Sequence, residues 1–176
     1  MMFLRWLLII IFFSPITTLA EDNTPCYAVV DIESILEHSL AVQHIKKNIN
    51  IISHNIQNDL VEKEIELKRI EANLIKQRGT LSEEEFNNKV LEFNAKVRES
   101  QQEAQQRKVA LEQAHSDALK EVYKNTMAVI DQLARQKNFD IIFPSSQILF
   151  VKNDLNITAE VLSHLNDRLK KVKINY

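Results

Sequence analysis

The sequence predicts an α+β protein that is mostly α-helical, in which a long antiparallel helical hairpin projects from a small β-containing body. Three observations predict this fold. The 176-residue chain contains a single glycine, Gly79. The two long stretches that flank it, 40–78 and 82–137, lack proline and repeat apolar residues with helical spacing. Short, almost wholly apolar segments near both ends of the chain have the composition of β-strands.

The first twenty residues predict a secretory signal peptide. Arg5 supplies a positive charge before the apolar run Trp6–Phe13, and Thr18-Leu19-Ala20 fits the small-x-small pattern of a cleavage site. The apolar run is shorter than the roughly 20 residues that a membrane-spanning helix needs, which argues against the alternative of an uncleaved anchor. We therefore expect residues 1–20 to be removed and the rest of the chain to be secreted.

A small body is predicted from residues 21–39 and 139–176, the two ends of the mature chain. The segment Tyr27–Val30 is a short apolar strand, and Asp31 can cap a helix that follows it. A lone cysteine, Cys26, excludes an internal disulfide. We expect it to pack at the start of the strand rather than to pair between subunits, because free cysteine is commonly buried.

The C-terminal part of the body predicts two further strands, residues 139–143 and 147–151, joined by a turn at Pro144. Asn156 or Thr158 can cap a final helix. Three strands and a short helix bury too little core to be stable alone, and the two late strands are apolar on both faces, so we expect the body to oligomerise. The residues expected in that oligomerisation body are Val29, Ile141, Phe143, Ile148 and Phe150.

The hairpin arm, residues 40–138, is predicted from two heptad-like apolar stripes. The first consists of Ile45, Ile49, Ile52, Ile56, Leu60, Leu67, Ile70 and Leu74. The second consists of Phe86, Val90, Phe93, Val97, Ala104, Leu111, Ala118, Val122, Val129 and Leu133, with Ser100, Arg107 and Ala114 at the intervening seam positions. Residues 99–108 carry few large apolar groups, so two interpretations stay open there: a bend or splay, and an ordinary thin coiled coil.

The tip of the arm is predicted at residues 79–81. Gly79 can adopt the left-handed conformation that ends a helix, and Ser82 with Glu85 forms a capping-box pattern for the second helix. The acidic run that begins at Glu83 is therefore interpreted as capping, not as a carboxylate site. At ~1.5 Å per residue the arms would be roughly 58 Å and 84 Å long, so they would project well beyond the body.

The residue pattern indicates neither an enzyme nor a cofactor site. A P-loop or a dinucleotide fingerprint needs several glycines, and the five histidines include no i,i+4 pair that further ligands would complete as a zinc site. Residues 40–138 carry 16 Lys and Arg against 15 Asp and Glu, a net charge of +1, which gives no argument for nucleic acid. We therefore expect no catalytic residue, cofactor, metal or nucleic-acid partner.

With these elements in place, the sequence resembles the Skp/OmpH family of periplasmic chaperones over essentially its whole length. The helical hairpin is the least specific part of the resemblance, and the opening segment Tyr27-Ala28-Val29-Val30-Asp31 is moderately specific. The closing block is the most specific part. It consists of Phe139-Asp140-Ile141-Ile142-Phe143-Pro144, Ile148-Leu149-Phe150 and Asn156-Ile157-Thr158-Ala159-Glu160-Val161-Leu162.

The resemblance implies a homotrimer, in which strands of three chains form a central body and three hairpins surround a cavity. It implies an ATP-independent holdase that keeps unfolded outer-membrane β-barrel proteins soluble. Contact with a membrane surface is a further expectation. Two features depart from the family pattern. Asn156 stands where an acidic residue is usual, and the near-neutral arm gives no basis for electrostatic capture of acidic clients or of lipopolysaccharide.

Client contacts are expected at the tip of the arm. The candidates are Ile75 and Leu81, which lie off the apolar stripe, with Phe86 and the basic residues Lys76, Arg78 and Lys89 around them. Leu74 and Phe86 have the simpler alternative role of closing the hairpin tip. The alternative function for the whole chain is a secreted coiled-coil scaffold of the cell envelope, which predicts a stable oligomer without affinity for unfolded barrels.

Overall fold

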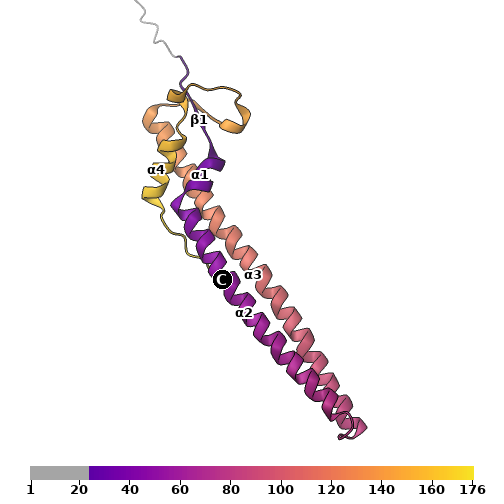
Figure 1. The fold of residues 1–176 in the computed structure, drawn as a ribbon. Helices are drawn as coiled ribbons and strands as arrows, with labels where there is room; N and C mark the ends of the chain where they lie inside the picture. The colour runs from indigo at the N-terminus through magenta and orange to yellow at the C-terminus, as the bar shows by residue number, and fades with distance from the viewer. Residues whose placement is uncertain (1–23) are drawn as a thin grey trace, which may run out of the picture.

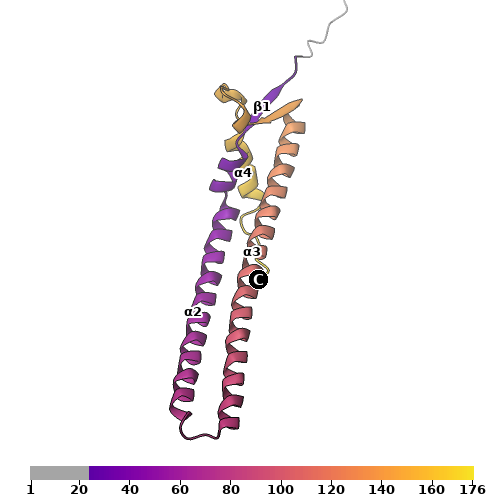
Figure 2. The same ribbon diagram turned by 90° about the vertical axis from the view of Figure 1, so that its right-hand side faces the viewer.

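The computed structural model describes residues 24–176, in which a long helical hairpin extends from a small body at one end (Figure 1; Figure 2). The predicted signal peptide lies outside the described residues. The elements follow in the order β1 (Tyr27–Val30), α1 (Ile32–His38), α2 (Leu40–Gln77), α3 (Glu83–Lys137), β2 (Ile141–Pro144), the 3-10 turns η1 (Ser145–Gln147) and η2 (Asn153–Leu155), and α4 (Thr158–Arg168). The predicted fold class, mostly helical with a small sheet, is confirmed.

The sheet of the body consists of two parallel strands drawn from opposite ends of the chain. Tyr27 lies opposite Ile141, and Val30 lies opposite Pro144. Parallel strands need a long crossover connection, and here the entire hairpin provides it. The sheet therefore closes the base of the arm and pairs a segment that precedes the hairpin with one that follows it.

The predicted strand at 147–151 is wrong. Beyond η1 these residues form neither helix nor strand, and within the segment Leu149 is fully exposed and Phe150 is 83% exposed. A strand needs a neighbouring edge for its backbone hydrogen bonds. Val29 of β1 already bridges to Asn156, and η1 carries the chain out into a loop beside the sheet (Figure 1). Among the described residues, no strand of the same chain therefore pairs with this apolar segment.

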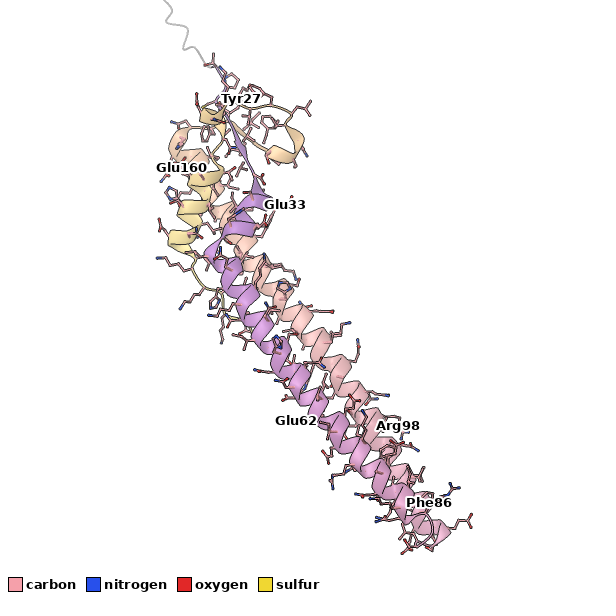
Figure 3. All side chains as sticks on the ribbon, viewed as in Figure 1. Tyr27, Glu33, Glu62, Phe86, Arg98 and Glu160 are labelled. Atoms are coloured by element: carbon pink, nitrogen blue, oxygen red, sulfur yellow. The ribbon has the colours of Figure 1, made fainter. Side chains whose placement is uncertain are left out.

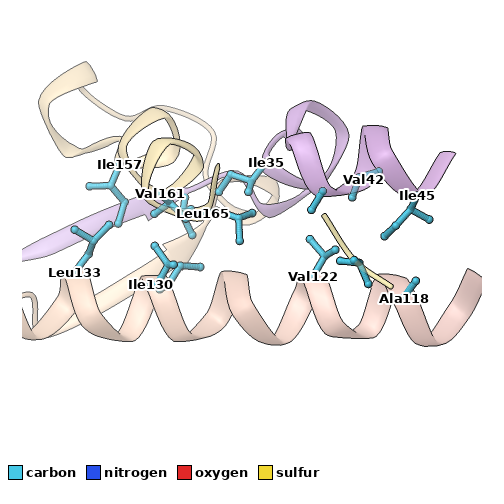
Figure 4. Close-up of a cluster of buried hydrophobic side chains, with 14 of the residues drawn as sticks. Ile35, Val42, Ile45, Ala118, Val122, Ile130, Leu133, Ile157, Val161 and Leu165 are labelled. Carbon is cyan, nitrogen blue, oxygen red and sulfur yellow. The ribbon is translucent and has the colours of Figure 1, made fainter. Parts of the chain in front are cut away.

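The main hydrophobic core lies where the body meets the base of the hairpin (Figure 4). Ile35 of α1 and Val161 and Leu165 of α4 are fully buried there. Opposite them α3 contributes a row of apolar side chains that includes Val122 and Leu133. Helix α3 thus acts both as the spine of the body and as one arm of the hairpin.

The predicted seam of the hairpin is confirmed, because every residue of both apolar stripes is buried or half-buried. Burial is deepest at the base, where Ile45 and Val122 are completely buried. Farther along the arm the same stripe is only half-covered, as at Leu60 and Val97. Two helices in contact along one stripe leave the flanks of that stripe in water.

The turn at the tip confirms one capping prediction and contradicts another. The Ser82 hydroxyl accepts the N–H of Glu85, and the Glu85 carboxylate accepts the N–H of Ser82, which completes a capping box. Gly79, however, does not adopt a positive φ. The N–H groups of Thr80 and Leu81 donate to the Gln77 carbonyl at 3.0 and 3.1 Å. Helix-like hydrogen bonds therefore close the end of α2, and no left-handed residue is needed.

A left-handed cap does occur, at the other end of the second helix. Asn138 ends α3 with φ of 55°, the one positive φ at a non-glycine residue in the described part of the chain. Asparagine tolerates this conformation better than most residues with a side chain. The cap redirects the chain from α3 towards β2 within a few residues.

The predicted cap of the final helix at Asn156 or Thr158 is wrong, because the N-cap of α4 is Ile157, which makes no side-chain cap hydrogen bond. The Asn156 side-chain oxygen accepts the N–H of Thr158 at 3.0 Å. The Thr158 hydroxyl oxygen instead accepts the N–H of Asp31 at 2.9 Å. Asp31 in turn accepts the N–H of Ser34 at 2.9 Å, as predicted for a helix cap. These hydrogen bonds connect the start of α4 to the junction of β1 and α1.

Candidate functional site

The hairpin divides into two parts that differ in what covers them. We call residues 40–49 and 114–137 the root, because the core cluster of the body includes side chains from both ranges. We call residues 50–113 the free arm. With 38 residues in α2 and 55 in α3, the helices are about 57 Å and 82 Å long at ~1.5 Å per residue. The free arm therefore projects far from the body and exposes a large surface (Figure 3).

The apolar-poor middle of the free arm is held by ion pairs, which we call the mid-arm cluster. Arg107 reaches Asp59 of the other helix at 2.8 Å and Glu103 of its own helix at 2.7 Å. Lys63 of α2 forms an ion pair with the same Glu103. Helix α3 is continuous through this region, which agrees with the thin coiled coil among the two interpretations. Flexibility at this point stays a prediction.

The ion pairs of the mid-arm cluster also shift the pKa values of Glu103 and Arg107. Hydrogen bonds to Glu103, first from Lys63 and then from Arg107, lower the pKa of that carboxyl group. The hydrogen bond to Asp59, followed by the one to Glu103, raises the pKa of Arg107. Both shifts favour the charged forms, so the cluster keeps its opposite charges at neutral pH.

The predicted tip residues fall into an exposed group and a half-buried group. Ile75 is 69% exposed, and the three basic residues Lys76, Arg78 and Lys89 are also exposed. Leu81 and Phe86 are half-buried, and Phe86 lies at the far end of the arm (Figure 3). Leu74 is buried, which fits the simpler role of closing the tip. Lys89 and Leu74 share an open groove of about 240 Å³ between the helices.

A set of exposed apolar side chains on the free arm was not predicted. We call them the outer apolar residues: Ile51, Val61, Ile65, Leu91 and Val109. Ile65 is 62% exposed and Leu91 is 64% exposed. The sequence carries a signal for them, because Ile65 lies between Glu64 and Glu66, off the seam stripe. Together with Ile75, they spread apolar contact area along the free arm instead of confining it to the tip.

The predicted body residues are placed unequally. Val29 is 5% exposed and already belongs to the interior of the single chain. Phe143 and Ile148 are half-buried, and the Phe143 ring lies 6.3 Å from that of Tyr27 between centroids. Ile141 and Phe150 are exposed, and so is Leu149, which the sequence reasoning did not select. The body therefore presents apolar side chains to solvent beside its two-stranded sheet.

Cys26 does not pack at the start of the strand, so that prediction is wrong. Its side chain is exposed. The residue precedes β1, and its backbone is held by the Asp140 carboxylate, which accepts the Cys26 N–H at 2.7 Å. Cys26 therefore lies just before the first strand, with its side chain exposed among the described residues.

Residues 24–176 contain neither a metal-binding cluster nor a helix that could span a membrane. In this range, no group of three or more His, Cys, Asp and Glu side chains is arranged to hold a metal ion. Nor does any helix there combine the length and hydropathy that crossing a membrane requires.

Comparisons with known proteins agree with this geometry. The family model described as outer membrane protein (OmpH-like) matches residues 27–165. No curated protein matches the chain. A crystal structure from Caulobacter crescentus CB15, described as a candidate outer membrane chaperone (OmpH-like), superposes with a TM-score of 0.79 and 17% identity, covering 86% of this chain and 89% of that one. At this identity the likeness shows the fold alone.

Proposed function

We propose a function from one premise, that this chain belongs to the OmpH-like family. The proposed function is that of an ATP-independent periplasmic holdase. It binds unfolded outer-membrane β-barrel proteins, its clients, and keeps them soluble during transit. No catalytic step and no cofactor take part.

The observation that carries the proposal is the exposure of apolar side chains along a charged free arm. Ile65 and Leu91 stand among charged and amide neighbours. Strands of an unfolded β-barrel expose apolar side chains at alternate positions. Each contact buries little area. Burial of apolar surface stabilises by about 25 cal/mol per Å², so a single contact is weak. Many such contacts hold a client, and a few broken at a time release it, so no nucleotide is required.

The tip supplies the second part of the proposed client surface. Ile75 is exposed near the end of α2, and Leu81 lies half-buried in the tip turn that follows α2. Lys76, Arg78 and Lys89 place positive charge around them. The arm as a whole is close to neutral, so charge orients a client here and contributes little affinity over the rest of the arm.

A homotrimer is proposed for the assembly. Its support is the exposed apolar set of the body, Ile141, Leu149 and Phe150. Such a set on a small two-stranded sheet favours a further chain as its cover. Replacing Leu149 and Phe150 by Asp would place charges in that interface. The expected result is a monomer by light scattering, whereas a trimer that survives both substitutions would contradict the interface.

The location is part of the proposal. Residues 1–20 carry the pattern of a cleaved signal peptide. Mass spectrometry of the periplasmic fraction would give a chain that starts near Glu21. Contact with a membrane surface is proposed as a secondary property, to be measured by co-flotation with anionic vesicles.

The test uses residues 21–176 mixed with a urea-unfolded outer-membrane β-barrel that is then diluted from urea. Size exclusion with light scattering is expected to give one soluble peak of three subunits with one client. The variant Ile65→Ser with Leu91→Ser should hold less client, as should Ile75→Ser with Leu81→Ser. Asn88→Ser, at an exposed polar site on the same arm, is the matched control.

The alternative function is a coiled-coil scaffold of the cell envelope. It predicts a clean oligomer that elutes alone while the barrel precipitates. In that case the fold assignment stands and the holdase proposal is wrong.

A further inference from the structure

The chain continues beyond α4 as an extended segment that runs back along the hairpin. We call residues 169–176 the strap. Helix α4 ends at Arg168, and Leu169 has extended backbone angles. Figure 2 shows the strap descending from α4 beside the hairpin, and the C-terminus lies against the hairpin in both ribbon views. The strap lies beyond the part of the chain that the family match covers.

The strap alternates between buried and exposed side chains. Val172 is 2% exposed and belongs to the same core cluster as Ile45 and Ala118 of the root. Ile174 packs against that cluster. Lys171 and Lys173, which flank Val172, are exposed. Inward residues two apart are the pattern of a β-strand with one apolar face.

Beyond Leu169, side chains alone hold the strap. Among the described residues, no hydrogen bond of the backbone or of a side chain involves residues 170–176. No ion pair in this part of the chain includes Lys170, Lys171 or Lys173. At its start the strap is attached by Leu169, which packs against the core cluster and donates its N–H to the Leu165 carbonyl at 2.7 Å, and beyond Leu169 the apolar side chains of Val172 and Ile174 are the attachment. A segment held in this way can leave without breaking a ladder or a salt bridge.

We infer that the strap occupies a client-binding site on the root and competes with the client for it. The seated strap shows which chemistry fits this place: an extended peptide with apolar side chains two residues apart. A strand of an unfolded outer-membrane β-barrel has that same pattern. When the strap leaves, the core cluster that contains Ile45 and Ala118 loses the apolar cover of Val172 and Ile174, and a client strand can supply it. This inference rests on the proposed holdase function.

The first experiment compares strap variants in the chain 21–176. Val172→Ser with Ile174→Ser releases the inward face, and Lys171→Ser with Lys173→Ser is the matched control on the outward face. Binding of a labelled, urea-unfolded outer-membrane barrel is measured by fluorescence anisotropy. The released variant is expected to bind at least about threefold more tightly, because removing a competitor raises the fraction of molecules with an open site. A synthetic strap peptide, Leu169 to Tyr176, added in excess should reverse this gain.

The outcomes separate the inference from the function on which it rests. If the native chain binds no barrel, the holdase proposal fails. If the native chain binds and the released variant binds equally or less, with unchanged helicity, the strap inference is overturned.

A second measurement covers the case in which the released variant does not fold. A spin label at Asn175, in a chain with Cys26→Ser, reports the mobility of the strap in otherwise native protein. Saturation with client is expected to make the label mobile. A label that stays immobile while client is bound overturns the inference.

Discussion

The root and the free arm consist of the same two helices, yet different forces hold them together. In the root, Ile45 and Val122 are fully buried because α1, α4 and the strap add further cover. In the free arm, the two helices have only each other, so Leu60 and Val97 stay half-buried. Ion pairs of the mid-arm cluster connect the two helices where the apolar seam is thin. The difference in burial between root and free arm therefore follows mainly from the further elements that pack on the root.

The largest expected effect is the loss of a core side chain at the root. Leu165→Ala should lower the free energy of unfolding by about 2–5 kcal/mol, because Leu165 is fully buried and leaves a cavity. Leu60→Ala, in the half-covered seam, should cost less than about 2 kcal/mol. Urea unfolding followed by circular dichroism measures both. Equal costs at the two sites would remove the contrast between root and free arm.

A smaller effect is expected at the tip cap. Ser82→Ala removes the hydroxyl that accepts the Glu85 N–H, and helix caps of this kind contribute about 1 kcal/mol. The loss should appear as faster amide hydrogen exchange in the first turn of α3, with the root unchanged. Asn88→Ala is the control on the same helix. Exchange that rises equally in the root would show that the two parts unfold as one unit.

The mid-arm cluster should affect geometry more than stability, since exposed ion pairs contribute little to unfolding free energy. Arg107→Gln removes both of its ion pairs, and Arg107→Leu instead extends the apolar seam. Spin labels at Gln57 and Gln105, which line one groove between the helices, report the spacing. We expect the distribution of distances between the two labels to be broader in Arg107→Gln and narrower in Arg107→Leu. Identical distributions would mean that the cluster does not set the spacing.

The smallest effect is expected from acid. The pKa of Glu103 is lowered in the folded protein, so its contribution is present above the ordinary carboxyl range. That contribution is lost as the pH falls through the lowered pKa. The same label pair should therefore widen only at strongly acidic pH, and Glu103→Gln should abolish the response. A widening that persists in Glu103→Gln would assign it to another group.

The candidate site divides into residues that the sequence pattern predicts and residues that it does not. The tip residues follow from the break in the apolar stripe at Gly79 and from the capping box at Ser82. The outer apolar residues were missed because a seam search selects residues that fit the stripe, and Ile65 does not. Leu149 was not selected, and its full exposure follows from the irregular backbone that residues 148–151 have in the fold. The packing of the strap on the root is visible only from the burial of Val172.

The sequence by itself determined the helices, the seam and the capping box, because these depend on residues within a few positions of one another. It also determined the strand β1 and its capped helix. The tertiary structure decided everything that joins distant residues. Asp31 and Thr158 are 127 positions apart, and Asp59 and Arg107 are 48 apart. The parallel sheet, the unpaired 147–151 segment and the seated strap likewise depend on which surfaces meet. A local pattern states what a segment can form, and only packing decides what partner it has.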